Sequence, residues 1–246
     1  MGKYLCICIF FASCTSNFNL KDGDFLFQDL DSSELCEAIE AVTNGYKGSN
    51  LSHVGLVTKQ NNEFLVIEAI PPEIVLTPLD TFLNRSKDYN GNPKVIVGRL
   101  KNEFKSNIEA SINYCLKRIG NKYDFEFIFN NNSMYCSELI YNSFNNEQIF
   151  KAQPMIFEDP NNEKIAKIWQ EYYLSINKPI PHNKLGVNPG LMSISNAIEI
   201  VHIYGHPSGY EPKKWKMKKI SFFIFIIYCA NINSSFAQNV LKKDIE

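Results

Sequence analysis

The sequence has little of what marks several common classes of protein. Its 25 Lys and Arg residues are balanced by 26 Asp and Glu, which gives a formal net charge of −1. Without a basic excess, nucleic acid is not an expected partner. The seven cysteines include no CxxC pair, so a common zinc-site pattern is missing. With 246 residues, the chain suits one domain of about 200 residues with appendages at both ends.

Three of the seven cysteines fall within the expected domain, at Cys36, Cys115 and Cys136. An odd number does not imply a full disulfide framework. Cys115 lies on a helical apolar stripe and Cys36 borders one, so we expect both in the core. His202 and His206 could suggest a metal, but no third ligand is evident and structural zinc sites use four. We therefore expect neither a metal nor a cofactor.

The N-terminal residues have the layout of an export signal. Lys3 precedes a short apolar run, and small residues followed by Cys14 close it, as in a secretory signal. We predict a signal peptide at 1–13 and a tether at 14–21. The cysteine resembles the first mature residue of a bacterial lipoprotein, so Cys14 is the predicted lipidation site. The alternatives are signal cleavage without lipid and an uncleaved apolar tail. This interpretation predicts an exported protein, anchored in the bacterial cell envelope and facing the periplasm.

The C-terminal segment 211–246 resembles a second export signal. Lysines at 218 and 219 precede an apolar run at 220–230, and Ala237 ends a site of the A-x-A type. The run has 11 residues, fewer than the ~20 that a membrane-spanning helix needs. We interpret the segment as an aberrant tail in which the reading frame enters a neighbouring signal. The alternative is a membrane-associated helix, and the tail is left out of the fold prediction.

One stretch of the domain carries a candidate nucleophile. Polar residues at 130–133 precede a helix-like pattern in which Leu139, Ile140 and Phe144 share a side. This places Cys136 in the first turn of a helix. There the backbone N–H groups lack intrahelical partners and the helix dipole is positive, which favours the nucleophilic thiolate. The alternative is a small buried apolar residue, a common role of free cysteine.

A predicted β-hairpin supplies the groups that such a nucleophile needs. Segments 52–57 and 64–70 have strand character, and the polar residues 60–62 form the turn between them. His53 begins the first strand, and Glu68 lies within the second. A carboxylate in an apolar strand is costly unless a partner satisfies it, and an imidazole would do so. Nucleophile, base and orienting acid are thus present, in a chain order that differs between folds.

The remaining pattern predicts an α+β domain at 22–210, with an antiparallel sheet packed against segregated helices. Further strands are expected at 24–27, 74–76, 95–100 and 198–204. Helices are expected after a capping box that begins at Asp31, at 104–119, and at 161–174 with Tyr172 facing inward.

Six short segments, in order, resemble the circularly permuted papain-like amidohydrolases of the YiiX/YebB-like group, relatives of the NlpC-type cell-wall peptidases. The segments are Gly23-Asp24-Phe25-Leu26-Phe27, Ser52-His53-Val54-Gly55, Val66-Ile67-Glu68-Ala69, Gly120-Asn121-Lys122-Tyr123-Asp124, Tyr135-Cys136-Ser137-Glu138-Leu139 and Gly186-Val187-Asn188-Pro189. The resemblance implies a papain-like fold, with Cys136 as nucleophile, His53 as base and Glu68 holding His53. Circular permutation explains why the histidine precedes the cysteine.

The resemblance also implies roles for two further parts of the chain. In NlpC-type relatives a Gly-x-x-Tyr segment stands before the nucleophile, so Tyr123 is the candidate for holding the oxyanion with the backbone N–H of Cys136. The alternative is a surface or core tyrosine. The segment 178–191 carries three prolines and two glycines, and we expect it to pack near the site as a specificity loop.

The predicted function is a cysteine-dependent amidohydrolase that cleaves an amide bond, in a cell-wall peptide, through a thioester acyl-enzyme. A lipid acyl hydrolase or acyltransferase is the first alternative, because permuted relatives include lipid acyltransferases. A non-catalytic lipoprotein that binds lipid or peptide is the second. The expected partners are therefore a cell-wall peptide or an acyl lipid, together with a membrane reached through the N-terminal lipid.

Overall fold

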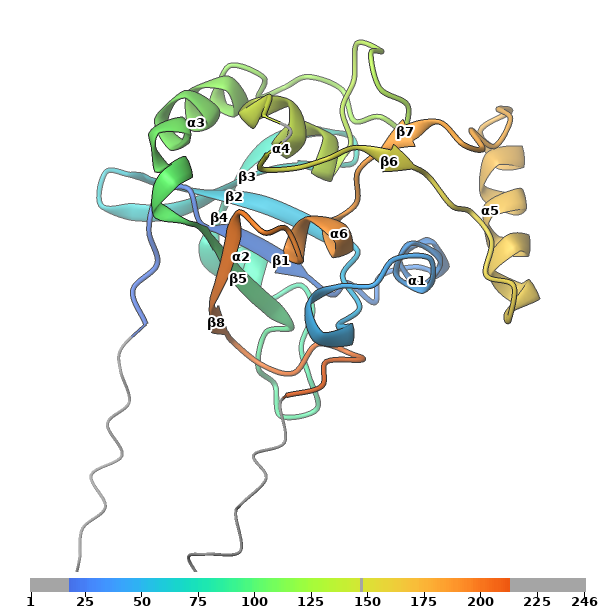
Figure 1. Cartoon of the computed structure of the whole chain (residues 1–246), viewed down its shortest axis with the longest axis horizontal. Coiled ribbons are helices and arrows are strands. Elements are labelled where there is room, and N and C mark those ends of the chain that lie inside the picture. Colours follow the sequence, from blue (N-terminus) through green and yellow to red (C-terminus); the bar gives the residue numbers. More distant parts are fainter. Residues whose placement is uncertain (1–17, 147, 213–246) are drawn as a thin grey trace, which may run out of the picture. The chain divides into compact units, whose positions relative to one another are not determined.

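The computed structural model describes residues 18–146 and 148–212 (Figure 1). The predicted signal peptide, the lipidation site at Cys14 and nearly all of the C-terminal tail lie outside these residues. Within the described part, every helix is too short or too polar to cross a membrane.

A six-stranded antiparallel sheet organises the domain, which confirms the predicted α+β class. Its strands lie in the order β4-β3-β2-β1-β5-β8, and every neighbouring pair is antiparallel. The strands are β1 (Phe25–Gln28), β2 (His53–Gln60), β3 (Glu63–Ile70), β4 (Glu73–Pro78), β5 (Val95–Leu100) and β8 (Ile198–Ile203). A separate two-stranded ribbon pairs β6 (Gln153–Pro154) with β7 (Leu185–Gly186). The predicted hairpin is thus confirmed as β2 and β3.

The helices lie around the sheet (Figure 1). They are α1 (Glu34–Ala41), α2 (Leu79–Leu83), α3 (Ile108–Leu116), α4 (Cys136–Phe144), α5 (Glu163–Ser175) and α6 (Pro189–Ser193). The α4 helix packs against α3 and against the β2–β3 hairpin, whereas α1 and α5 pack against each other. Because α4 rests on the hairpin, its first turn lies close to the strands that carry the predicted base and acid.

Each face of the sheet buries its own apolar cluster, because successive side chains of a strand point to opposite faces. Leu56 and Ile67 pack with Leu139 of α4 in the larger cluster. Val57 and Val66 pack on the other face with Phe82 of α2. The hairpin is therefore held from both sides, which fixes the positions of the polar side chains that it carries.

A third cluster, rich in aromatic residues, joins α1 to α5. Trp169 lies edge-on to Phe157 with ring centroids 5.0 Å apart. Tyr172 packs against this cluster, as predicted, and is half-exposed, whereas the next residue, Tyr173, is buried. The Tyr172 hydroxyl donates to the carbonyl of Phe125 at 2.7 Å. This cluster forms a wall of the cavity described below.

Two predicted helix boundaries are corrected by the structure. The N-cap of α1 is Ser33, whose hydroxyl accepts from the backbone N–H of Cys36 at 3.4 Å, whereas Asp31 pairs with Lys94 at 2.5 Å. The long helix predicted at 104–119 is divided into a 3₁₀ turn at Asn102–Asn107 and the shorter α3. Ion pairing and local turn geometry thus override the sequence signals at both sites.

Candidate active site

Cys136 is the first residue of α4, as predicted, and its side chain is almost fully buried. The preceding residue, Tyr135, is extended and caps the helix. Glu138, in the first turn of α4, is buried close behind Cys136. At this end the backbone N–H of Cys136 has no partner within the helix and the dipole is positive. The sulfur therefore lies where negative charge is stabilised.

The hairpin brings His53 and Glu68 into direct contact. Their register, with Leu56 opposite Ile67, places both side chains on one face as diagonal neighbours. The distance from His53 Nε2 to Glu68 Oε2 is 2.6 Å. His53 is 5% exposed and Glu68 is fully buried, so the contact is shielded from water.

A glycine in the motif around His53 makes room for an aromatic neighbour. A side chain at Gly55 would collide with Val66 and come within 3.2 Å of Phe82. Phe82 also packs against His53, with ring centroids 5.8 Å apart. The absence of a side chain at position 55 thus allows an aromatic ring to brace the imidazole.

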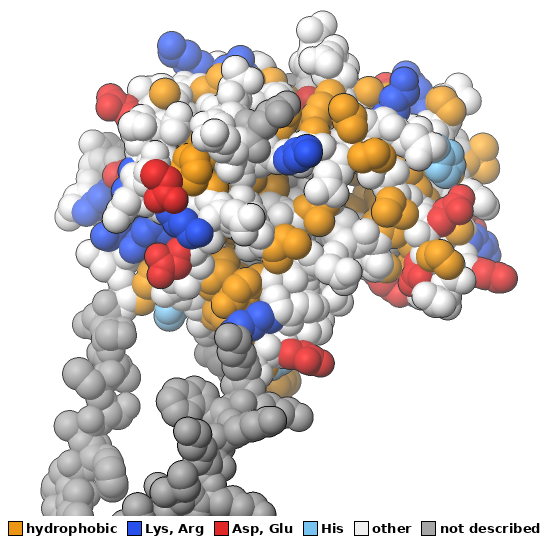
Figure 2. Space-filling view, viewed as in Figure 1, with side chains coloured by type: hydrophobic (Ala, Val, Ile, Leu, Met, Phe, Trp, Pro, Cys, Tyr) orange, Lys and Arg blue, Asp and Glu red, His pale blue; other side chains and the backbone are white. Residues whose placement is uncertain are grey.

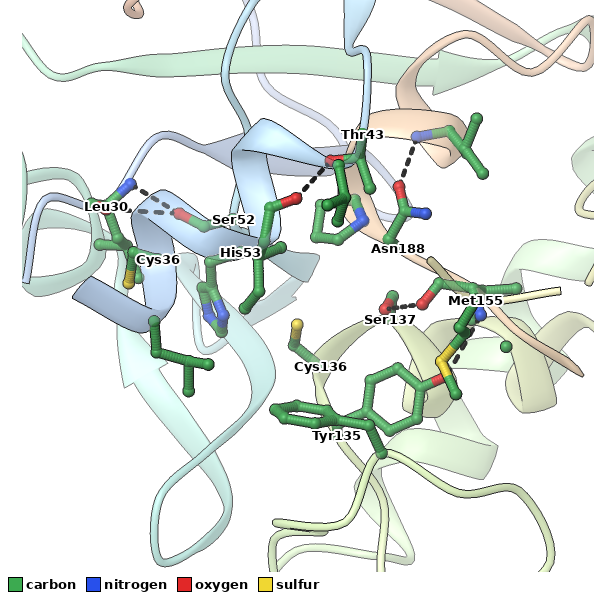
Figure 3. Close-up of a pocket in the computed structure, with 18 of the residues that line it drawn as sticks. Leu30, Cys36, Thr43, Ser52, His53, Tyr135, Cys136, Ser137, Met155 and Asn188 are labelled. Atoms are coloured by element: carbon green, nitrogen blue, oxygen red, sulfur yellow. Dashed lines mark hydrogen bonds between the residues drawn. The ribbon is translucent and has the colours of Figure 1, made fainter. Parts of the chain in front are cut away.

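The free side of the imidazole faces the nucleophile. Figure 3 shows the Cys136 sulfur beside the His53 ring, and both side chains line one cavity. His53 Nε2 contacts Glu68, which leaves Nδ1 as the ring nitrogen available to a second partner. Burial would lower the pKa of His53, but the neighbouring Cys136 and Glu68 side chains outweigh it and raise this pKa to about 9. The ring is therefore cationic at neutral pH and stabilises a thiolate beside it.

Glu68 has further partners that the sequence did not identify. Arg85, in the loop after α2, donates from its two terminal nitrogens to both carboxylate oxygens, at 2.6 and 2.5 Å. The Thr77 hydroxyl of β4 donates to Oε1 at 2.5 Å. Burial would raise the pKa of Glu68, but the bonds from His53 and Arg85 lower it to about 2. Glu68 is thus a fixed negative charge across the physiological pH range.

Tyr123 lies in the same cavity as the cysteine and the histidine. A backbone bridge between Tyr123 and Met134 holds it next to the segment that leads into α4. Burial, and then the nearby Cys136 sulfur, raise the pKa of Tyr123 well above its usual value. Its phenol is therefore neutral and can donate a hydrogen bond.

The cavity that contains these groups has a volume of about 490 Å³. Cys136 and His53 lie in its wall, and its lining is mainly apolar. Representative apolar residues are Leu35, Ile39, Val42, Phe157, Trp169 and Val187. Figure 2 shows hydrophobic side chains gathered around a hollow on one face of the molecule. A cavity of this size and lining suits a small or elongated apolar group.

The predicted specificity loop is attached to the start of α4. The Ser137 hydroxyl donates to the Val187 carbonyl at 2.9 Å, and the Val187 N–H donates to the Tyr135 hydroxyl at 3.2 Å. A side chain at Gly186 would collide with Met155, so the glycine permits the close approach. The part of this loop around β7 therefore forms a wall of the cavity next to the nucleophile.

The other two cysteines differ from Cys136. Cys115 is buried as predicted, and burial raises its pKa to about 12, so it is an inert thiol. The prediction that Cys36 is a core residue is wrong. It is half-exposed, lines the cavity, and lies within 3.4 Å of the Ser32 hydroxyl.

Two proteins from Escherichia coli are similar to the chain. "Uncharacterized protein YiiX" of strain K12 is 26% identical over 171 residues, which is 68% of this chain and 78% of that protein. The crystal structure described as "metalloprotein yiiX" from strain O157:H7 has a TM-score of 0.61 and 24% identity, and the match covers 76% of this chain and 98% of the other. The second comparison shows a shared fold.

The word "metalloprotein" in that description concerns the Escherichia coli structure. Among residues 18–146 and 148–212 of this chain, no group of three or more His, Cys, Asp and Glu side chains could hold a metal ion. His202, considered above as a ligand, stacks on Phe18 with ring centroids 4.2 Å apart. The described side chains therefore do not fit a bound metal.

Residues 19–202 match the family described as "Permuted papain-like amidase enzyme, YaeF/YiiX, C92 family". The match spans most of the chain and includes Cys136, His53 and Glu68. It agrees with the resemblance of the six sequence segments and with the sheet that supports the site. The chain therefore belongs to the permuted papain-like amidases of the C92 family.

Proposed function

We propose that this protein hydrolyses an amide bond through a thioester formed on Cys136, with His53 as the base and acid and Glu68 as the group that holds His53. The observation that carries the proposal is the Cys136 sulfur beside the His53 ring in one cavity, with the same ring 2.6 Å from Glu68 Oε2. Papain-like amidase chemistry at the family level gives it a second support.

In the first step the Cys136 sulfur attacks the amide carbon. The carbonyl π electrons move to oxygen and give a tetrahedral intermediate. As this intermediate collapses, the C–N bond breaks and His53 gives its proton to the leaving amine. The products are a free amine and an acyl group bound to sulfur, and His53 is left neutral.

The oxyanion of the intermediate needs donors that already point at it. The backbone N–H of Cys136, at the first position of α4, is one such donor. The Tyr123 hydroxyl is the proposed second donor, because the phenol is neutral and lies near the sulfur. This role does not require Tyr123 to ionise.

In the second step water releases the acyl group. Neutral His53 takes a proton from a water molecule as the water oxygen attacks the thioester carbon. The C–S bond then breaks, which gives a carboxylic acid and restores the thiolate beside the protonated imidazole.

The proposed substrate is a cell-wall peptide amide, which fits an exported lipoprotein that faces the periplasm. One observation favours a second candidate, an amide or ester of a lipid acyl chain. The cavity next to Cys136 is mainly apolar, and an acyl chain would bury its CH₂ groups there at about 0.8 kcal/mol each.

The experiment compares the full-length protein with Cys136→Ala on muropeptides and on phospholipid vesicles, with product release followed by mass spectrometry. We expect the unsubstituted protein to release product from one substrate and the variant to release none. Product release by both proteins would contradict the assignment of Cys136. Release from lipid alone would favour the second candidate.

Alkylation by iodoacetamide at about pH 5 tests the nucleophile without a substrate. We expect Cys136 to react first, because a helix N-terminus and a cationic imidazole beside a sulfur increase its nucleophilicity. Cys36 and Cys115 of the same chain are internal controls, the first more exposed and the second more buried than Cys136. Alkylation of Cys36 ahead of Cys136 would contradict the proposal.

A further inference from the structure

We propose that Arg85 is a positioning residue of the active site, which acts on Cys136 through Glu68 and His53. The inference rests on the proposed function and extends the three-residue site by a fourth member. Arg85 lies outside the cavity lining, so its role would be to orient and charge the groups that line it.

The geometry supports a specific role for a guanidinium at this position. Two of its nitrogens bond to the two oxygens of one carboxylate, at 2.6 and 2.5 Å. Such a bidentate pair fixes the rotation of the carboxylate plane, which a lysine cannot do. With the plane fixed, Glu68 Oε2 also accepts from His53 Nε2 at 2.6 Å. The orientation of the imidazole therefore depends on Arg85.

Neighbouring contacts hold Arg85 itself in place. Its guanidinium lies over the ring of Phe82, 5.4 Å from the centroid, and the same ring packs against His53. The side chain of Arg85 is 22% exposed and that of Glu68 is fully buried. One aromatic ring thus braces both the arginine and the histidine, on either side of the carboxylate that joins them.

The charge of Arg85 also limits how strongly Glu68 attracts the His53 proton. The charged or titratable groups that face the His53 ring are Glu68 from β3 and Cys136 from α4, with Arg85 behind Glu68 and Tyr123 beside the sulfur. Arg85 shares the negative charge of Glu68. Without Arg85, the negative charge of Glu68 would act on His53 alone, and His53 would keep its proton to a higher pH.

The test uses two alkylating reagents on the full-length protein across pH 5 to 11, a range chosen to span the titration of His53. Iodoacetate is an anion and is attracted to a protonated imidazole, whereas iodoacetamide is neutral. The ratio of their rates at Cys136 therefore falls as His53 loses its proton. We expect the unsubstituted protein to show this fall near pH 9, the pKa of His53.

Arg85→Gln removes the charge and the bidentate contact, and Arg85→Lys keeps the charge alone. For Arg85→Gln we expect the pH at which the rate ratio has fallen halfway, called the midpoint, to rise by about one unit. We expect the rate of Cys136 alkylation by iodoacetamide at pH 6 to fall about tenfold. For Arg85→Lys we expect an unchanged midpoint and a smaller loss of rate. Arg118→Gln is the matched control, because Arg118 bonds the carbonyl of Tyr114 and does not line the cavity.

The outcomes separate the inference from the proposed function. If Arg85→Gln does not fold, the test rests on Arg85→Lys. A rate of Cys136 alkylation in Arg85→Lys equal to that of the unsubstituted protein would show that Arg85 does not orient Glu68 and His53. Folded variants with unchanged midpoints and rates, but lower stability, would show that Arg85 only supports the fold. If Cys136 of the unsubstituted protein shows no selective alkylation and no fall in the ratio, the proposed function fails regardless of Arg85.

Discussion

Two buried glutamates next to the active site have opposite charge states. Glu68 in β3 is fully buried, and Glu138 in the first turn of α4 is 1% exposed. Burial raises the pKa of Glu138 to about 8, with a further contribution from the charge of Asp124. Burial acts on Glu68 in the same direction, yet its partners bring its pKa down to about 2.

The difference lies in the partners of each carboxylate. Glu68 accepts hydrogen bonds from a protonated histidine, a guanidinium and a hydroxyl. Glu138 accepts only a long contact of 3.5 Å from Asn142 among the described residues, and its Oε2 is buried without a partner. Burial therefore sets the cost of a charge, and charged donors decide whether the group carries one. Glu68 can hold His53 as an anion, whereas Glu138 is a neutral acid at pH 7.

Neutralising each glutamate should affect the reaction very differently. Glu68→Gln removes the anion that holds and charges His53, so we expect alkylation of Cys136 and substrate turnover to fall about a hundredfold or more. Glu138→Gln replaces one neutral group by another of the same shape, so we expect both rates to stay within about twofold at pH 6. The measurement is the iodoacetamide rate of Cys136 at that pH, with turnover of the substrate as the second readout.

Similar losses of rate in Glu68→Gln and Glu138→Gln would contradict this difference, because they would show that Glu138 also carries a charge that the site uses. Circular dichroism of both variants is the control for folding. Arg85 faces an amide in Glu68→Gln, so a partial loss of stability is expected there without loss of the fold.

The parts of the site that the sequence predicted are those with strong local signals. Alternating apolar residues and a polar turn predicted the hairpin that joins His53 to Glu68. A polar run before an apolar stripe predicted that Cys136 begins a helix. These signals are local because strand alternation and helix capping depend on neighbours in the chain.

The partners of Glu68 could not be predicted in the same way. Arg85 follows a short helix, and Thr77 depends on the register between β3 and β4. No local pattern distinguishes either residue from other arginines and threonines, since their roles arise from contacts across strands. For the same reason the charge state of Glu138, which depends on Asp124 and on the depth of burial, is not visible in the sequence.

The two glutamates should also make stability depend on pH in opposite directions. The folded-state pKa of Glu68 lies below the usual value of 4.5. Ionised Glu68 therefore stabilises the folded protein above pH 4.5, and this stabilisation is lost as the pH falls through about 2. The folded-state pKa of Glu138 lies above 4.5. Its contribution to the free energy of unfolding is therefore present below pH 4.5 and is lost as the pH rises through about 8. Within each of these two pH ranges, the free energy of unfolding changes by at most about 1.4 kcal/mol per pH unit.

Urea unfolding at a series of pH values measures both windows. We expect Glu138→Gln to remove part of the fall in stability between pH 4.5 and 8, and Glu68→Gln to remove part of the rise between pH 2 and 4.5. Differences from the unsubstituted protein are compared because Glu40, whose pKa burial also raises to about 8, shares the first window. A Glu138→Gln curve parallel to that of the unsubstituted protein from pH 4.5 to 8 would contradict a neutral Glu138.

The smallest expected effects come from single neutral partners of the two carboxylates. Thr77→Val removes one of the hydrogen bonds to Glu68 and keeps the shape of the side chain. We expect it to lower the free energy of unfolding by about 1 kcal/mol and to leave the alkylation of Cys136 within about twofold, because Arg85 and His53 still hold the carboxylate.

Asn142→Ala removes the long contact to Glu138, so we expect a loss of less than about 0.5 kcal/mol from that contact. Urea unfolding at pH 7 measures both, and a larger loss from Asn142 than from Thr77 would mean that Glu138 depends on its partner more than Glu68 does.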